Sequence, residues 1–372
     1  MAGIFEPWNL GTLTLPNRLV RSATWEAMAD PQGVPGYELA NLLGELAAGQ
    51  VGLIITGYAF VTPQGRGLPQ QTGVHVDAMV GPLTRVSDAV HKEGGKIAMQ
   101  IVHAGGQTRG KWINAQPAGP SAMVHPAYNE EVRELGREEI WDLVDAFAAA
   151  AARVKAAEFD AVELHGAHGY LLSQFLCPFT NSRSDDFGGS LANRARFARE
   201  VTRAVREVVG PNFPVFIKLN SEDAVPRGFT LDEAVQVAQW LVADGLDAVE
   251  VSGGVAFGGA LSPSRVVKTP ADEGYFLANA RAIKQAIAKP VIVVGGFRRR
   301  AKVAEALASV DAVALSRPFI RQPDLAARWA RGENLDATCI SCGQCFTHSL
   351  KDGLVCVQEL KKQRQEALGA TD

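Results

Sequence analysis

Two histidines and a tyrosine stand close together in the segment Glu163-Leu-His-Gly-Ala-His-Gly-Tyr170. They follow an apolar run that predicts a strand, and they lie where that strand gives way to a Gly-rich loop. Two imidazoles can donate hydrogen bonds to one oxygen atom, and a phenol can deliver a proton. We therefore predict that His165 and His168 polarise a substrate oxygen and that Tyr170 is a proton donor.

Two other interpretations of these histidines stay open. They could be polar side chains of a surface loop, with no role in chemistry. They could also be zinc ligands, but zinc would require a third ligand nearby, and the chain has no HExxH-type helix pattern.

Short β-branched runs alternate along the chain with helical patterns, and these elements must position the trio. The predicted strands are 19–24, 52–59, 96–103, 161–167, 215–220, 248–253, 291–296 and 312–317. The predicted helices are 38–48, 77–93, 137–156, 190–208, 231–244, 276–287, 300–307 and 321–330.

This alternation predicts the α/β class, as a parallel sheet closed into a (β/α)8 TIM barrel. A doubly wound open sheet is the alternative, although its Gly-rich dinucleotide signature is missing. We expect a single domain, with the barrel at 1–330 and a short Cys-containing C-terminal extension at 331–372. The long segments 104–135 and 168–189 follow strand ends and are expected to cover the site.

The length, composition and net charge of the chain limit the kinds of partner that it can have. The chain has 372 residues, 47% of them apolar, and a net charge of -3, which gives no reason to expect nucleic acid or an anionic membrane. It has no 18-residue apolar run, and its first residues lack the basic and apolar parts of a secretory signal. We expect a cytoplasmic protein.

Glycines and an arginine at the later strand ends predict a phosphate site. Gly295 and Gly296 end the seventh strand, Ser316 and Arg317 end the eighth, and Gly253 follows the sixth. Loops after the last two strands of such barrels often hold phosphate through backbone N–H groups, and arginine adds a bidentate donor. A phosphorylated ligand or cofactor is therefore expected.

Two polar residues interrupt otherwise apolar strands. Lys218 lies within the run VFIKLN, and a lysine on a buried strand requires a partner or a function unless it reaches solvent at the rim. Gln100 lies near the end of the run IAMQIVH, and its amide can both donate and accept hydrogen bonds.

Together these residues resemble the Old Yellow Enzyme family of FMN-dependent ene-reductases, also called NADH:flavin oxidoreductases. The resemblance spans nearly all of residues 4–330, and two motifs are specific to that family. The first is His165-Gly-Ala-His-Gly-Tyr-Leu, and the second is Asn181-Ser-Arg-Ser-Asp-Asp-Phe-Gly-Gly-Ser-Leu-Ala-Asn-Arg194. Further matches are Leu15-Pro-Asn-Arg-Leu, Val51-Gly-Leu-Ile, Gln100, His103-Ala-Gly, Lys218, Val294-Gly-Gly and Ser316-Arg-Pro.

The resemblance implies a noncovalent FMN at the barrel mouth. Its phosphate would lie on Gly296, Ser316 and Arg317, and Gln100 and Lys218 would address the ring edges. The residues expected beside the flavin are Ser22, Ala23, Thr24, Gly57 and Tyr58.

The resemblance also implies a reaction. NADH or NADPH reduces the flavin, and an α,β-unsaturated carbonyl compound (an enone or a related activated alkene) then binds with its oxygen on His165 and His168. Flavin N5 delivers hydride to the β-carbon, and Tyr170 protonates the α-carbon. Members often form dimers or larger assemblies, so a homo-oligomer is expected.

This chain departs from the family in two places near the site. Trp25 follows Ser22-Ala-Thr where many relatives carry a small Cys or Thr, and an indole there is expected to shape the substrate pocket. Ser316 replaces the usual glycine before the arginine, a small change that should keep the phosphate contact.

Four of the five cysteines crowd the C-terminal extension, as Cys339-x2-Cys342-x2-Cys345-x10-Cys356. The pattern is similar to the iron–sulfur region of the 2,4-dienoyl-CoA reductase and trimethylamine dehydrogenase branch, whose Cys-x2-Cys-x3-Cys spacing is one residue longer. An iron–sulfur cluster, a zinc site and metal-free thiols are the three interpretations.

Three other functions stay open beside the ene-reductase. The first is an oxidative flavoenzyme of the same family, a demethylase or dehydrogenase. The second is a phosphate-binding barrel lyase or isomerase without flavin. The third is a module that stores flavin or carries electrons.

Overall fold

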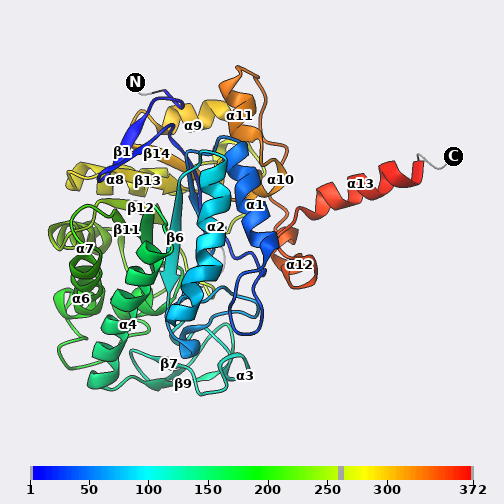
Figure 1. Cartoon of the computed structure of the whole chain (residues 1–372). Coiled ribbons are helices and arrows are strands. Elements are labelled where there is room, and N and C mark those ends of the chain that lie inside the picture. Colours follow the sequence, from blue (N-terminus) through cyan, green and yellow to red (C-terminus); the bar gives the residue numbers. More distant parts are fainter. Residues whose placement is uncertain (1–2, 259–263, 370–372) are drawn as a thin grey trace.

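The computed structural model describes residues 3–258 and 264–369 of the chain. Within them, eight parallel strands close into a barrel through the pairing of β6 with β10, and helices surround it (Figure 1). The barrel strands are β3 (Leu19–Arg21), β4 (Leu53–Ile55), β6 (Ile97–Val102), β10 (Ala161–Gly166), β11 (Val215–Asn220), β12 (Ala248–Ser252), β13 (Val291–Val294) and β14 (Ala312–Leu315). The predicted (β/α)8 barrel is confirmed, and the open sheet is wrong.

The helices of the barrel lie between the strands, close to the predicted ranges. They are α1 (Tyr37–Ala48), α2 (Val80–Lys92), α4 (Arg137–Ala156), α6 (Leu191–Val209), α7 (Leu231–Ala243), α8 (Leu277–Ala286), α9 (Arg300–Ala306), α10 (Arg317–Arg321) and α11 (Leu325–Ala330). Short helices α3 (Gly110–Ile113) and α5 (Leu171–Leu176) lie in the loops that follow β6 and β10.

Some predicted boundaries are wrong for local reasons. The predicted helix 321–330 begins later, at Leu325 of α11, and only Arg321 belongs to α10, because Pro323 between the two helices cannot donate a helical hydrogen bond. The predicted strand 52–59 stops at Ile55 and resumes as β5 (Ala59–Phe60), because the Gly57 N–H is bound to the carboxylate of Glu26 at 2.7 Å. The start of the predicted helix 77–93 is a 3-10 turn, η2 (Asp77–Met79).

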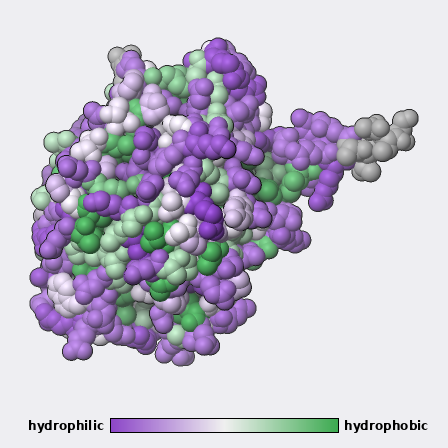
Figure 2. Space-filling view, in the orientation of Figure 1, coloured by the Kyte–Doolittle hydropathy of each residue, from purple (hydrophilic) through white to green (hydrophobic). Residues whose placement is uncertain are grey.

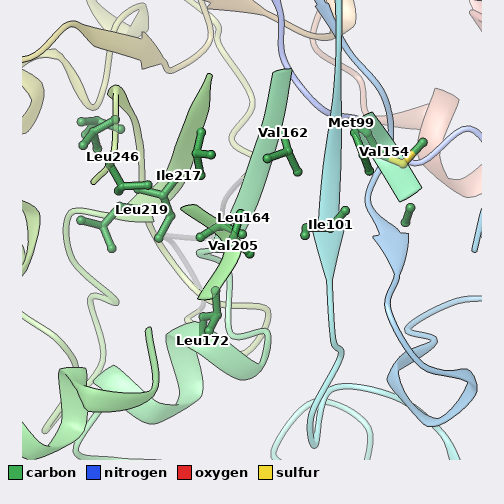
Figure 3. Close-up of a cluster of buried hydrophobic side chains, with 14 of the residues drawn as sticks. Met99, Ile101, Val154, Val162, Leu164, Leu172, Val205, Ile217, Leu219 and Leu246 are labelled. Atoms are coloured by element: carbon green, nitrogen blue, oxygen red, sulfur yellow. The ribbon is translucent and has the colours of Figure 1, made fainter. Parts of the chain in front are cut away.

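The period of two along the strands divides the core into two parts. Outward side chains such as Val162, Leu164, Ile217 and Leu219 pack between the barrel and the helices (Figure 3). Inward side chains form a separate apolar cluster around Phe216, with small residues from the neighbouring strands. The hairpin of β1 (Trp8–Leu10) and β2 (Leu13–Leu15) joins this inner cluster at the end of the barrel away from the site.

Two further parts extend the barrel. The loop after β6 carries a small sheet of β7 (Ala118–Gly119), β8 (Met123–Val124) and β9 (Glu131–Glu134). The C-terminal segment forms α12 (Gln344–Asp352) and α13 (Val357–Gly369), and α13 projects from the body with a hydrophilic surface (Figures 1 and 2). The division at residue 330 stays a prediction, and residues 1–2 and 370–372 lie outside the described residues.

The segment before α12 contacts the barrel through carbonyl groups. Cys339 accepts a hydrogen bond from Arg298 at 3.1 Å, and Thr338 accepts one from Arg321 at 3.0 Å. No helix among the described residues is long and apolar enough to cross a membrane.

Candidate functional site

A cavity of about 520 Å³ opens at the carboxyl ends of the barrel strands, as expected for the active face of this fold. It brings together most of the predicted site residues from seven of the eight strand ends. Those that line it are Ser22, Ala23, Thr24, Trp25, Tyr58, Gln100, His165, His168, Tyr170, Lys218, Gly296, Ser316 and Arg317.

Three predicted glycines do not line this cavity. Gly57 is held by Glu26, whose carboxylate also pairs with Arg21 at 3.1 Å. Gly253 packs so close to Phe276 that a Cβ would lie 2.7 Å from its ring. Gly295 accepts a hydrogen bond from the N–H of Gly274 at 2.7 Å, beneath the loop that carries Gly296.

The predicted trio surrounds one part of the cavity. The ring centroid of His165 lies 5.2 Å from that of His168 and 4.8 Å from that of Tyr170. His168 Nε2 is 2.7 Å from the Ser252 hydroxyl, whereas His165 Nδ1 is buried with no hydrogen-bond partner within the described residues. An unsatisfied buried nitrogen is costly, so this atom is a ready donor or acceptor for a ligand.

Burial keeps all three groups uncharged at neutral pH. It lowers the pKa of His168 to about 3, with a contribution from the nearby charge of Lys218, and it lowers the pKa of His165 well below the usual value. Burial raises the pKa of Tyr170 to about 12. Neutral imidazoles can polarise an oxygen without carrying charge, and the phenol retains the proton that a donor must deliver.

A layer of polar side chains forms the floor beneath the trio. Lys218 Nζ lies 2.5 Å from Glu250 and 3.8 Å from Glu163, and it donates to the Ser22 hydroxyl at 3.0 Å. Gln100 donates to Glu163 at 2.6 Å. These residues come from neighbouring barrel strands and face inward by the same period of two.

The two buried carboxyl groups of this layer differ in charge. Burial raises the pKa of Glu163 well above its usual range, and Lys218 only partly opposes this. Burial would also raise the pKa of Glu250, but the charge of Lys218 and the hydrogen bonds to the carboxylate lower it overall. The layer therefore favours the ionised form of Glu250 and the protonated form of Glu163. Neither glutamate is among the residues predicted from the sequence, although each interrupts an apolar strand as Lys218 does.

The far end of the cavity fits a phosphate group. Arg298 and Arg317 both line it, beside Gly296. Gly296 has a φ of +74°, and a Cβ there would lie 2.5 Å from Val267 and 2.7 Å from the ring of Tyr275, so only glycine fits. Arg298 is not among the predicted residues, although it follows Gly296 by two positions in the same loop.

Comparisons with known proteins give the family of the chain. Residues 3–336 match the NADH:flavin oxidoreductase / NADH oxidase family. This chain belongs to that family. It is the Old Yellow Enzyme family that the motifs indicate, and its members are FMN-dependent oxidoreductases that use NAD(P)H.

Three relatives show the range of this flavin oxidoreductase family. A 4,4'-dithiodibutanoate disulfide reductase of Rhodococcus erythropolis is 35% identical over 95% of this chain and 94% of its own length. The structure of a 2-naphthoyl-CoA reductase in complex with 2-naphthoyl-CoA has a TM-score of 0.88 and 27% identity, covering 95% of this chain. An Old Yellow Enzyme homologue from Zymomonas mobilis has a TM-score of 0.78 and 26% identity, covering 90% of this chain and 94% of its own.

The relatives differ in length. This flavin oxidoreductase chain spans 56% of the 2-naphthoyl-CoA reductase chain, but nearly the whole of the disulfide reductase.

The residues present fit FMN, the cofactor of the family. Arg298, Arg317 and Gly296 suit its phosphate, and Gln100 and Lys218 lie on the cavity floor where a ring edge can reach them. The buried Trp25 Nε1 has no hydrogen-bond partner within the described residues, which leaves a further polar atom for a ligand.

The C-terminal segment forms one wall of the flavin oxidoreductase site. Phe346 of α12 packs against Trp25, with ring centroids 5.5 Å apart, and the buried Leu354 also lines the cavity. The Ser341 carbonyl accepts a hydrogen bond from Arg317 at 3.2 Å. The sequence predicts an extension separate from the barrel and gives no sign of this part in the site.

The four C-terminal cysteines line a second, small cavity beside the first. Cys339, Cys342, Cys345 and Cys356 surround it, and none of them forms a disulfide. Burial raises the pKa of Cys339 and Cys345, which keeps these thiols protonated. Among residues 3–258 and 264–369, no group of three His, Cys, Asp or Glu side chains is arranged to hold a metal ion.

Proposed function

We propose that this flavin oxidoreductase reduces the C=C bond of α,β-unsaturated carbonyl compounds with NAD(P)H. The observation that carries the proposal is the convergence of two neutral imidazoles and one protonated phenol on a single point of the cavity. A carbonyl oxygen held there would be polarised, and its conjugated β-carbon would become electrophilic. Bound FMN would supply the hydride.

The role of each side chain follows from its protonation state. His165 and His168 have no charge to lose, so they act as hydrogen-bond donors rather than as acids. Tyr170 retains its proton at neutral pH and lies beside His165, so it is the group able to protonate the α-carbon. Trp25 and Phe346 line the same cavity and would limit the shape of the alkene.

A second candidate is disulfide reduction. The relative from Rhodococcus erythropolis, named for the disulfide 4,4'-dithiodibutanoate, is 35% identical over 95% of this chain. The 2-naphthoyl-CoA reductase supports the first candidate, since a naphthoyl group is a ring conjugated to a carbonyl.

The test is anaerobic turnover by purified protein that shows the visible spectrum of an oxidised flavin. Consumption of NADH or NADPH is measured with cyclohexenone and, separately, with 4,4'-dithiodibutanoate. The proposal expects consumption that depends on the enone and yields the saturated ketone. Turnover with the disulfide and not with the enone would favour the second candidate over the first. Protein that stays colourless after FMN addition and desalting would contradict both candidates.

We further propose that the cysteine segment carries a redox or structural role. Its four thiols gather around one small cavity next to the flavin site, and an iron–sulfur cluster, a zinc ion and free thiols are its alternatives. Iron, acid-labile sulfide and zinc analysis of anaerobically purified protein decides among them. We also propose a homo-oligomer, which light scattering tests.

A further inference from the structure

His168 has a backbone conformation that few residues other than glycine adopt. Its φ is +62°, in the left-handed region, where a side chain other than that of glycine is strained. A strained residue persists only where its surroundings fix it. Gln107 donates to the His168 carbonyl at 3.1 Å, and side chains at the ends of β11 and β12 make two further contacts.

Asn220, at the end of β11, fixes the backbone of His168. Its side-chain oxygen accepts a hydrogen bond from the His168 N–H at 3.0 Å. Its amide nitrogen donates to Asp223 at 2.7 Å and to the Gly254 carbonyl at 3.0 Å, so the amide itself cannot turn over. Asn220 and Asp223 are buried, which strengthens these bonds.

Ser252, at the end of β12, holds the ring. Its hydroxyl lies 2.7 Å from His168 Nε2 and makes no other hydrogen bond within the described residues. The position faces inward, two residues after Glu250 on the same strand, and it lines the cavity. Because Nε2 is occupied by Ser252, the nitrogen left for a ligand is Nδ1.

A neutral imidazole carries one proton, and its location decides what Nδ1 can do. If Nε2 carries the proton, Nε2 donates to Ser252, and Nδ1 can only accept. If Nδ1 carries the proton, the Ser252 hydroxyl donates to Nε2, and Nδ1 can donate to an oxygen. Only the second arrangement polarises a carbonyl.

We propose that Ser252 and Asn220 are positioning residues for His168. Asn220 fixes the strained backbone, and Ser252 donates to Nε2 and so selects the Nδ1–H tautomer that presents a donor to the ligand oxygen. The choice of tautomer rests on the proposed function, whereas the contacts that Asn220 and Ser252 make with His168 do not.

The tautomer is measured by nitrogen-15 NMR of the FMN-containing protein with labelled histidine. Protonated and unprotonated imidazole nitrogens resonate far apart, and the His168 signals are assigned as those missing from His168→Asn. We expect the proton on Nδ1 in the wild-type protein. A proton on Nε2 overturns the proposal, whether or not any enone is reduced.

The Ser252→Ala variant tests the cause. We expect the His168 proton to move in part to Nε2 and kcat/KM for the enone to fall by about tenfold, the value of one hydrogen bond. Ser252→Thr, which keeps the hydroxyl, should restore both the tautomer and the rate. Ser221→Ala is the matched control, since its buried hydroxyl binds the Ser252 carbonyl at 2.8 Å and does not contact His168.

The outcomes separate this inference from the proposed function. An unchanged tautomer in Ser252→Ala, or an equal effect of Ser221→Ala, overturns the positioning role. Absence of enone turnover by wild-type protein with the proton on Nδ1 overturns the function and leaves the positioning role intact.

Discussion

Aromatic rings surround Tyr170, and their packing can be kept when only its hydroxyl is removed. Its ring centroid lies 5.1 Å from that of Tyr58 and 4.8 Å from that of His165. Phenylalanine at this position would keep the ring contacts and remove only the hydroxyl. The residue thus allows its chemistry to be tested apart from its packing.

We predict that Tyr170→Phe slows the step that consumes the enone by about 10²- to 10⁴-fold, the usual contribution of a positioned acid. Reduction of the bound flavin by NAD(P)H requires no proton from Tyr170 and should be nearly unchanged. Rapid-mixing absorbance of the two half-reactions measures both rates. Equal loss in both would argue against Tyr170 as the donor.

The buried histidines give the stability a defined dependence on pH. The pKa of His168 is lowered to about 3 in the folded protein from an ordinary 6.5, so the unfolded chain binds the extra proton between these values. Proton binding by His168 therefore does not oppose folding above pH 6.5. Below pH 6.5 the free energy of unfolding decreases as the pH falls toward 3.

We expect wild-type protein to lose more stability between pH 7.5 and pH 5 than His168→Asn does. The difference should approach about 1.4 kcal/mol per pH unit below 6.5, the slope for one proton. Urea unfolding of both proteins at several pH values measures it. Parallel curves would show that His168 is not held neutral.

At the scale of the elements, the loop after β13 owes its shape to one glycine. Gly296 combines a left-handed backbone with side chains on all sides. Gly94, after α2, has the same φ of +74°, but a Cβ added there would have no atom within 4 Å, so it separates backbone strain from crowding.

We predict that Gly94→Ala costs about 1 kcal/mol of unfolding free energy and leaves FMN binding unchanged. Gly296→Ala should cost about 1–3 kcal/mol more, because Val267 and Tyr275 must move, and FMN affinity should fall. Urea unfolding and flavin fluorescence titration measure the two effects. Similar FMN affinities for both variants would place the phosphate elsewhere.

Helix α12 contributes Cys345 and Phe346 to the cavity and turns Leu350 away from it. Phe346 and Leu350 are both about half exposed, at 55% and 52%, but only Phe346 lines the cavity and contacts Trp25. A substitution at Phe346 alters the cavity wall, and the same substitution at Leu350 controls for effects on the helix as a whole.

We expect Phe346→Ala to raise the ratio of kcat/KM for a bulky enone over cyclohexenone by about tenfold, since space opens beside Trp25. Leu350→Ala should leave the ratio unchanged. Steady-state kinetics with the two enones provides the measurement. An unchanged ratio in both variants would show that α12 does not shape the pocket.

At the scale of the whole molecule, closure of the barrel places four strands' polar side chains in one buried layer. Gln100 meets Glu163 because β6 pairs with β10 to close the sheet, and Lys218 lies opposite Glu250 where β11 pairs with β12. Within this layer Lys218 Nζ lies 2.5 Å from Glu250, the carboxyl group whose pKa is lowered.

We predict that Lys218→Met destabilises the fold by about 3–5 kcal/mol, because Glu250 is left as a buried charge. Glu250→Gln should cost less, since Glu163 lies 3.8 Å from Lys218 and can ionise in its place. Urea unfolding at neutral pH compares the two. An equal cost would contradict the assignment of one protonated acid to this layer.

Much of the fold and part of the site could be predicted from the sequence. Runs of β-branched residues indicate the strands, and His165, His168 and Tyr170 lie within one short motif, so their proximity is a local property. The phosphate loops are predictable because barrels use the same two strand ends repeatedly.

The remaining features depend on contacts between distant parts of the chain. Glu250 meets Lys218 across a strand pairing, Ser252 meets His168 across the barrel mouth, and Phe346 reaches Trp25 from the far end of the sequence. No local pattern encodes such distances, because each is set by how the strands register and close.

The sequence by itself therefore determined the barrel, the family and the chemical character of the trio, since these depend on periodicity and short motifs. Only the tertiary structure decided which groups are buried, which hydroxyl lies beside His168 Nε2 and which segment walls the cavity. These properties arise from burial and from neighbours supplied by other elements, and burial exists only once the barrel has closed.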